Sequence, residues 1–224
     1  MPSGLTSRLV IAIPGIAVAV AVVAIGGVVF AIAMAVIAGL GLRELFSLTA
    51  AQRPLRWAGD VGVFATIALA WGMDDHERGL LLGLAIGFFL TVIAGLIVPR
   101  RDEITIRMAA TLLGIVYLGV PFAILVIMRD LPHGAAAIVN VLVGVWVVDS
   151  ASYFGGRMYG RRPIAPLTSP RKTVEGAVIG LVTATLAVWI AGLYMDWIGG
   201  WESLILGLAI CPASRFSSDS NRSP

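Results

Sequence analysis

Asp149 is the first residue whose side chain could take part in chemistry, because it is a carboxylate inside the apolar run VLVGVWVVDSASYFGG. If a helix ends near Phe154, Asp149 lies about 7–8 Å inside that end, at 1.5 Å per residue. Ionisable residues at such depth usually face protein or a water-filled cavity. Ser152 and Tyr153 can share its helix face. A carboxylate paired with a loop arginine is the simpler alternative, but aspartate is short and snorkels poorly, so we favour a functional role.

A basic loop follows directly. It contains no acidic residue and five cations, namely Arg157, Arg161, Arg162, Arg171 and Lys172. Membrane topology and attraction to anionic lipid heads, about 1 kcal/mol per cation near the surface, can explain such a loop. Gly155, Gly156 and Gly160 form no phosphate fingerprint, because the strand and helix context of a dinucleotide loop is missing. We therefore interpret these glycines as turn residues.

The end of this loop, SPRKTVEGAVIG, predicts a helix start. Either Ser169 caps the helix with Pro170 at the first helical position, or Thr173 caps it with Glu175 in the first turn. Glu175 then serves as a partner of the helix dipole, or as a metal-binding or hydrogen-bonding group in the same cleft. The pattern leaves both alternatives open.

Arg171 and Lys172 stand at the positive end of that helix, where cations are unfavourable unless an anion is present. Helix N-termini bind phosphate through free N–H groups, and nearby cations strengthen the binding. We expect an anion site or a simple membrane anchor here. Asp149 adds a carboxylate oxygen of the kind that Mg²⁺ binds in metal–phosphate sites.

The elements that must position these residues are membrane helices. The 224-residue chain is 58% hydrophobic and 13% charged, whereas soluble domains carry about 25% charged residues. It is an integral membrane protein, so its net charge of +3 does not indicate nucleic acid. The single cysteine, Cys211, excludes an intramolecular disulfide. We expect no cleavable signal peptide, because the first apolar run is too long.

The fold class we predict is all-α, a polytopic bundle of seven to eight transmembrane spans. The uncharged run Leu9–Leu42 fits two short spans that turn at Gly26-Gly27. The remaining runs are 57–73, 80–98, 108–128, 134–154, 173–195 and a last one from Gly199 to Cys211. Residues 1–210 form one membrane domain, and 211–224 form a polar tail that we expect to be disordered.

Loop charges predict the orientation. Three cationic loops lie on one side of the membrane. The first contains Arg43, Arg53 and Arg56, the second Arg100, Arg101 and Arg107, and the third is 155–172. The other side holds only Arg78 and Arg129, accompanied by acidic residues. Since cytoplasmic loops carry an excess of arginine and lysine, the 155–172 loop is predicted to face the cytoplasm.

Segment 146–180 resembles the core of the bacterial phosphatidate cytidylyltransferases, also called CDP-diacylglycerol synthases. The matching positions are Asp149, Tyr153, Phe154, Gly156, Arg157, Gly160, Ser169, Pro170, Lys172, Thr173, Glu175 and Gly176. LTSRLVIAIPG and GLRELF, nearer the N-terminus, also resemble the family, and the layout matches from about residue 5 to 210.

The resemblance implies an enzyme that joins CTP and phosphatidic acid, using Mg²⁺, to give CDP-diacylglycerol and pyrophosphate. It implies Lys172 and Asp149 as catalytic residues, with Asp149 also a metal ligand. The implied substrate-binding residues are Ser169, Arg171, Thr173, Arg157, Arg161 and Glu175. The implied partners are CTP, phosphatidic acid and membrane lipids, and a homodimer is a further expectation. The resemblance implies a protein of the bacterial inner membrane whose site faces the cytoplasm, with the lipid substrate entering from the cytoplasmic leaflet.

One departure from the family concerns the C-terminus. The family carries a Ser-x-x-Lys-Arg segment, a Lys-Asp pair and a Pro-Gly-His-Gly-Gly stretch ending in metal-binding aspartates. After Ile210 this chain continues as CPASRFSSDSNRSP, with none of these features. The pattern indicates a truncation or frameshift, and we expect the chain alone to be inactive.

Two other functional classes compete with the enzyme. In a transporter, Asp149 would be an ion or substrate ligand, but paired intramembrane charges and corresponding broken helices are missing from the sequence. In a non-catalytic lipid-binding protein, the 155–172 loop would be a patch for anionic lipids, with salt-sensitive binding that ignores CTP.

Overall fold

The computed structural model describes residues 4–98, 103–165 and 169–193, with a few single positions between 201 and 209. Within them the chain is helical apart from one two-stranded sheet. It forms two compact units, Met1–Ala135 and Ala136–Pro224, here called unit 1 and unit 2. The predicted tail, 211–224, lies outside the described residues, as does most of the run that begins at Gly199.

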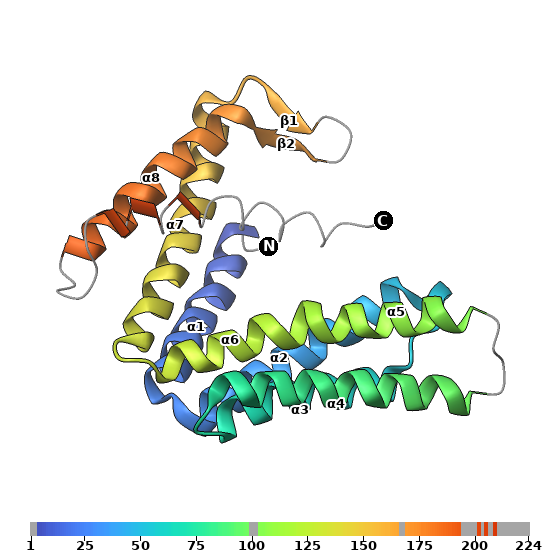
Figure 1. The fold of residues 1–224 in the computed structure, drawn as a ribbon. Coiled ribbons are helices and arrows are strands. Elements are labelled where there is room, and N and C mark those ends of the chain that lie inside the picture. Colours follow the sequence, from blue (N-terminus) through green and yellow to red (C-terminus); the bar gives the residue numbers. More distant parts are fainter. Residues whose placement is uncertain are drawn as a thin grey trace. The chain divides into compact units, whose positions relative to one another are not determined.

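Unit 1 is a helix bundle (Figure 1). Its elements are α1 (Gly4–Ile25), α2 (Gly27–Leu48), the short η1 (Ala50–Gln52), α3 (Arg56–Gly72), α4 (His76–Ile97), α5 (Ile104–Gly114), the π-helical η2 (Ile115–Gly119) and α6 (Val120–Asp130). The last three form one continuous helix. Unit 2 comprises α7 (Gly134–Tyr159), β1 (Pro163–Ala165), β2 (Ser169–Thr173) and α8 (Val174–Leu193).

Seven helices in the described part of the chain follow the first seven predicted apolar runs. Five are long and apolar enough to cross a membrane, namely Gly27–Leu48, His76–Ile97, Ile104–Asp130, Gly134–Tyr159 and Val174–Leu193. α3 has only 17 residues, and the apolar part of α1 is Pro14–Ile25. The prediction of a polytopic helical membrane protein is confirmed, and the number of seven to eight crossings stays a prediction.

The predicted turn at Gly26 and Gly27 joins α1 to α2. Their φ angles of 68° and 52° are left-handed, a conformation that glycine adopts without a Cβ penalty. Arg129, near the end of α6, fastens this turn: its Nε donates to the carbonyl oxygen of Val23 at 2.6 Å, and Nη2 donates to that of Ala24 at 3.1 Å. These carbonyls end α1, where helical partners are missing.

The packing of α3 against α4 depends on glycines. Gly79, Gly83 and Gly87 recur every four residues on α4, a spacing that lets helix backbones approach closely in membranes. A Cβ at Gly83 would meet the backbone of Thr66, and one at Gly87 would lie 3.1 Å from the Cα of Gly62. The buried Thr66 hydroxyl donates a hydrogen bond to the Gly62 carbonyl at 2.7 Å, so this polar group has a partner inside the helix contact.

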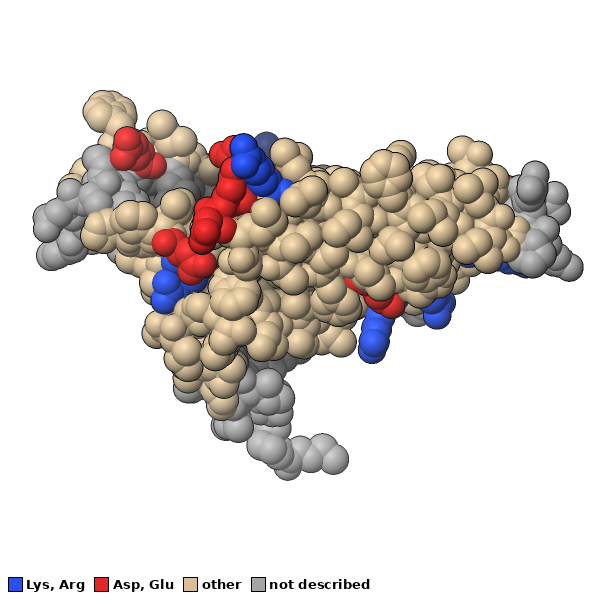
Figure 2. Space-filling model, turned by 60° about the horizontal axis from the view of Figure 1, so that its bottom comes forward, with Lys and Arg blue, Asp and Glu red and all other residues tan. Residues whose placement is uncertain are grey.

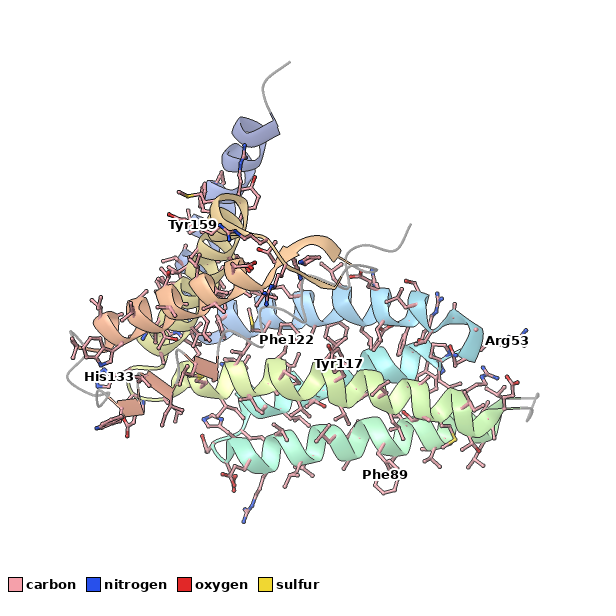
Figure 3. All side chains as sticks on the ribbon, turned by 90° about the horizontal axis from the view of Figure 1, so that it is seen from above. Arg53, Phe89, Tyr117, Phe122, His133 and Tyr159 are labelled. Atoms are coloured by element: carbon pink, nitrogen blue, oxygen red, sulfur yellow. The ribbon has the colours of Figure 1, made fainter. Side chains whose placement is uncertain are left out.

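Charged residues lie toward the ends of unit 1. Arg107 Nε donates to the Arg53 carbonyl at 2.9 Å, so two of the predicted cytoplasmic loops meet at one end. Figure 3 shows Arg53 and His133 at opposite ends of the bundle. Arg78, at the start of α4, forms an ion pair with Asp75 at 3.0 Å. The third cationic loop belongs to unit 2, so its membrane side stays a prediction.

The surface between these ends is apolar. Figure 2 shows a face that is mostly uncharged, with acidic and basic side chains gathered in a few places. Phe89 points outward from α4 and is 62% exposed (Figure 3). Exposed apolar surface of this extent is rare on soluble monomers and is what lipid-facing helices present.

In unit 2, the segment before α8 is a strand and not a helix start. β1 and β2 pair antiparallel, with Pro163 opposite Thr173. The alternative in which Ser169 caps a helix with Pro170 at its first position is therefore wrong, and α8 begins at Val174. Pro170 disfavours the helical conformation at the residue before it, which favours an extended Ser169. This small sheet is an addition to the predicted all-α fold.

Candidate functional site

Close packing of α7 against α8 positions the candidate site. A Cβ at Gly176 would lie 2.6 Å from the Ser152 carbonyl oxygen and 2.7 Å from the Cα of Gly156. A Cβ at Gly180 would meet the Ser152 hydroxyl and lie 3.0 Å from the Val148 carbonyl oxygen. Small residues at this spacing allow the two backbones to touch. Ser152 is therefore a packing residue against α8.

The helix that carries Asp149 is longer than predicted. α7 continues past Phe154 to Tyr159 and is closed by the Gly160 N–H, which donates to the Gly156 carbonyl at 3.0 Å. The paired glycines that we interpreted as a turn remain helical, because α8 packs directly on them. Asp149 thus lies about 15 Å from the helix end, at 1.5 Å per residue, and not 7–8 Å.

The N-terminus of α8 is capped by Thr173, as the second alternative predicted. Its Oγ1 accepts a hydrogen bond from the Gly176 N–H at 3.3 Å. The Val174 N–H donates to the Arg162 carbonyl at 2.9 Å. Because two of the first three N–H groups already have partners, an anion here would depend on side-chain cations more than on free helix amides.

Glu175 holds the basic loop. One carboxylate oxygen, Oε2, accepts hydrogen bonds from the main-chain N–H groups of Arg161 at 3.0 Å and Arg162 at 3.2 Å. This is a hydrogen-bonding role in the first turn of α8, one of the predicted alternatives. The carboxylate fixes the loop backbone and leaves both arginine side chains exposed.

Asp149 and Lys172 are brought together from different elements. Lys172, on β2, is half-buried and attracts the Asp149 carboxylate of α7 electrostatically. Asp149 is exposed on its helix within unit 2. The site therefore holds one cation and one carboxylate that interact electrostatically, and these are the groups that phosphate and a metal ion bind.

The other predicted residues extend this basic surface. Arg157 is exposed, and its Nη1 donates to the Tyr153 hydroxyl at 3.5 Å. Arg161 is exposed on the loop held by Glu175. Ser169 and Arg171 have their backbone in β2, and their side chains lie outside the described part of the structure.

The described residues fit Mg²⁺ only in part. No group of three or more His, Cys, Asp or Glu side chains gathers among them. Mg²⁺ commonly binds one or two carboxylates together with substrate phosphates and water. Asp149 can supply one such oxygen, and Glu175 is engaged with the loop backbone.

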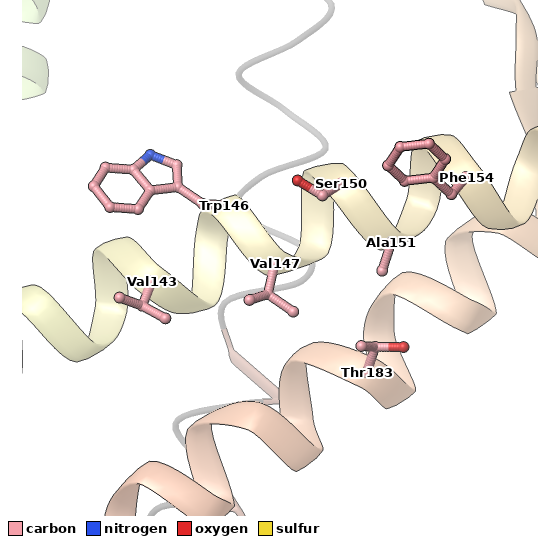
Figure 4. A pocket seen from close by; sticks show the side chains of 7 residues that line it. All are labelled: Val143, Trp146, Val147, Ser150, Ala151, Phe154 and Thr183. Carbon is pink, nitrogen blue, oxygen red and sulfur yellow. The ribbon is translucent and has the colours of Figure 1, made fainter. Parts of the chain in front are cut away.

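An apolar groove along α7 was not predicted. It has a volume of about 400 Å³ and is lined on α7 and α8 by Val143, Trp146, Val147, Ser150, Ala151, Phe154 and Thr183 (Figure 4). The α7 positions repeat at three- and four-residue intervals, so they share one helix face. That spacing could have revealed the stripe, but not the contribution of Thr183 from α8.

Comparison with known proteins establishes the family. The profile described as the cytidylyltransferase family matches residues 6–216. The chain belongs to the cytidylyltransferase family. The resemblance inferred from segment 146–180 is confirmed.

Relatives of this cytidylyltransferase-family chain carry the name phosphatidate cytidylyltransferase. That of Brucella suis is 34% identical over 140 residues, which are 62% of this chain and 50% of the relative. That of Bacillus subtilis is 37% identical over 91 residues, 38% of this chain and 34% of the relative. That of Haemophilus influenzae is 42% identical over 62 residues, which are 28% of this chain and 22% of the relative. The matched segments span half or less of these relatives.

Proposed function

We propose that this chain binds CTP and phosphatidic acid for transfer of the cytidylyl group, producing CDP-diacylglycerol and pyrophosphate. One observation carries the proposal: Lys172 lies within electrostatic reach of Asp149, inside the segment that carries the family resemblance. The pair belongs to a helix that can span a membrane and to the strand beside it.

In the proposed reaction, an oxygen of the lipid phosphate attacks the α-phosphorus of CTP. A new P–O bond forms while the bond from the α-phosphorus to the bridging oxygen breaks, and pyrophosphate leaves with that electron pair. Lys172 binds the phosphate oxygens and neutralises charge that develops on them, since preorganised cations are most effective where charge accumulates. Arg157 and Arg161, which are exposed, bind the outer phosphates of CTP.

The carboxylates have separate roles in this proposal. Asp149 orients the Lys172 ammonium and offers an oxygen ligand to Mg²⁺. When bound, Mg²⁺ supplies further neutralisation of phosphate charge. Glu175 and Thr173 act as positioning residues, because they fix the loop and the start of α8. Ser169 and Arg171 are assigned to phosphate binding through the family resemblance alone.

The proposed location is the bacterial inner membrane, with the 155–172 loop facing the cytoplasm where CTP is available. The arginine-rich loops support this side, and the bacterial relatives support a bacterial membrane. A homodimer stays a prediction of the family resemblance.

Binding of CTP tests the proposal directly. The purified chain in phosphatidylcholine nanodiscs that contain phosphatidic acid is equilibrated with labelled CTP and Mg²⁺. We expect saturable binding that ATP does not displace and that Lys172→Ala abolishes. Arg78→Ala is the matched control, because Arg78 pairs with Asp75 in unit 1. Absent binding, or equal binding by wild type and Lys172→Ala, would overturn the proposal.

Turnover is measured separately, as lipid-extractable label formed from CTP. In a chain joined to the C-terminal metal-binding motif of the family, Lys172→Ala should lower the rate by about 10²–10³-fold, the usual effect of removing one electrostatic donor. An unchanged rate would remove Lys172 from the site.

A further inference from the structure

The side chain of Thr173 lies against two glycines at the end of α7. A Cβ at Gly160 would lie 2.6 Å from the Thr173 Cγ2 and 2.7 Å from its Oγ1. A Cβ at Gly156 would lie 3.0 Å from the same oxygen. The last turn of α7 therefore has a notch, formed by Gly156 and Gly160 and here called the glycine notch, that the Thr173 side chain fills.

Thr173 is held on two further sides, both within unit 2. It lies opposite Pro163 in the pairing of β1 with β2, and its Oγ1 accepts a hydrogen bond from the Gly176 N–H at 3.3 Å. The following N–H, that of Val174, donates to the Arg162 carbonyl at 2.9 Å. One residue thus joins the end of α7, the strand β1 and the first turn of α8.

Lys172 directly precedes Thr173 on β2, so the main chain carries the position of Thr173 to Lys172. Gly156 follows Asp149 by seven residues, about two turns at 3.6 residues per turn, and both positions lie on the same side of α7. Lys172 acts electrostatically on Asp149 from β2. The closeness of β2 to this side of α7 therefore governs the separation of the ammonium from the carboxylate.

We propose that Gly156 and Gly160 are positioning residues for the pair of Lys172 and Asp149. Their missing side chains let Thr173 lie against α7, and this contact sets the separation of the two charges. The assignment rests on the proposed function and deepens it, because the pair is the element that binds phosphate and metal there. A side chain in the glycine notch lifts β2 from α7 and moves Lys172 away from Asp149.

NMR of Lys172 tests this role without any nucleotide. Lys172 is the single lysine of the sequence, so reductive methylation with isotope-labelled formaldehyde marks only this ammonium and the N-terminal amine. Lys172→Arg lacks the lysine signal and so assigns it. In phosphatidylcholine nanodiscs, the displacement of that signal by Asp149→Asn measures the coupling of the two charges. We expect a clear displacement in the otherwise wild-type chain, and its absence would overturn the inference.

Gly156→Ala is the main variant. Its added methyl group approaches the Thr173 Oγ1 at 3.0 Å and otherwise only the Gly176 Cα, at 3.8 Å. The displacement of the Lys172 signal by Asp149→Asn should fall to half or less in this background. Gly160→Ala should reduce it further, but its methyl group also meets the Gly156 carbonyl oxygen, so the conclusion depends on Gly156→Ala. An undiminished displacement in Gly156→Ala would overturn the inference.

Gly155→Ala is the matched control. It adds the same methyl group one residue earlier, where the group lies 2.8 Å from the Ile179 Cδ1 of α8 and does not approach Thr173. The coupling of Lys172 with Asp149 should stay as in wild type. An equal loss of coupling in Gly155→Ala would mean that any loosening of α7 against α8 has this effect, and would remove the specific role of the glycine notch.

A double-mutant cycle examines the contact itself. Thr173→Ala removes the oxygen that the new methyl group of Gly156→Ala would meet. The loss of coupling caused by Thr173→Ala should therefore be smaller in the Gly156→Ala background than in wild type, whereas it should be unchanged in the Gly155→Ala background. Additive effects of Gly156→Ala and Thr173→Ala would contradict a shared contact and overturn the inference.

Binding of CTP to the unmethylated chain distinguishes this inference from the proposed function. Gly156→Ala should weaken CTP binding by about three- to tenfold, less than the loss of a whole charge-assisted hydrogen bond, and Gly155→Ala should leave it unchanged. Reduced coupling in Gly156→Ala, in a chain that binds no CTP, would retain the positioning role and remove the enzymatic function. CTP binding by wild type with undiminished coupling in Gly156→Ala would retain the function and remove the inference.

Discussion

The carboxylate of Glu175 accepts a hydrogen bond from the main-chain N–H of Arg161 at 3.0 Å, across the loop that separates α7 from α8. The same oxygen accepts a second one from Arg162 at 3.2 Å. A side chain in the first turn of one helix therefore fixes the backbone that follows the preceding helix. The loop cations gain a defined position without using their own side chains.

Replacing Glu175 by alanine should release this loop. Both main-chain N–H groups lose their acceptor, so the backbone after Arg161 becomes accessible to trypsin, and cleavage there should accelerate severalfold. The measurement is limited proteolysis in nanodiscs with mass spectrometry of the fragments. Glu77→Ala, in the first turn of α4, is the matched control and should leave the cleavage rate at this loop unchanged. An unaltered rate in Glu175→Ala would contradict the proposed positioning role.

Gly180→Ala should weaken the contact of α7 with α8. The added methyl group meets the Ser152 hydroxyl and lies 3.0 Å from the Val148 carbonyl oxygen, so we expect a loss of about 1–3 kcal/mol in the free energy of unfolding, as for other overpacked sites. Equilibrium unfolding in mixed micelles measures it. Gly72→Ala is the control, because a Cβ there has nothing within 4 Å. Ser152→Gly should partly restore Gly180→Ala, and failure to do so would place the strain elsewhere.

Lys172 should react selectively with an aldehyde analogue of CTP. It is the single lysine of the sequence, so periodate-oxidised CTP can form a reducible imine with only this side chain and the N-terminal amine. Peptide mapping after borohydride reduction should find the label on Lys172, with protection by CTP and not by ATP. Lys172→Arg keeps the charge and should lose this label. Label confined to the N-terminus would argue against nucleotide contact at Lys172.

Single cysteines should report the predicted orientation. In a Cys211→Ser background, Arg161→Cys should resist a membrane-impermeant maleimide in intact cells and react after permeabilisation. Arg78→Cys, from the opposite set of loops, should react in intact cells. The reverse pattern, or equal labelling of both, would contradict a cytoplasmic 155–172 loop.

Features set by local sequence were predictable. Uncharged apolar runs became helices because lipid requires every backbone group to be paired internally. The Gly26-Gly27 turn followed from the excess length of Leu9–Leu42, and the Thr173 cap was one of two alternatives that residue preferences allowed.

Features that depend on a second element were missed. Gly155 and Gly156 looked like a turn, but they remain helical because α8 approaches too closely for larger residues. Their helical conformation places Asp149 deeper than expected. The hydrogen bonds of Glu175 involve residues 13 and 14 positions away, and the groove needs Thr183 from another helix. Such relationships carry no periodic signal in one chain segment.

The attachment of Arg129 to Val23 and Ala24 has a consequence for synthesis. These carbonyls end the first helix, and the guanidinium that pairs with them is encoded more than 100 residues later. At ribosomal rates of about 5–20 residues per second, that distance corresponds to roughly 5–20 s. Throughout this interval the nascent hairpin enters the bilayer with two carbonyls that only water, lipid headgroups or the insertion machinery can satisfy. The turn between α1 and α2 therefore gains its hydrogen bonds to Arg129 only after α6 has been synthesised.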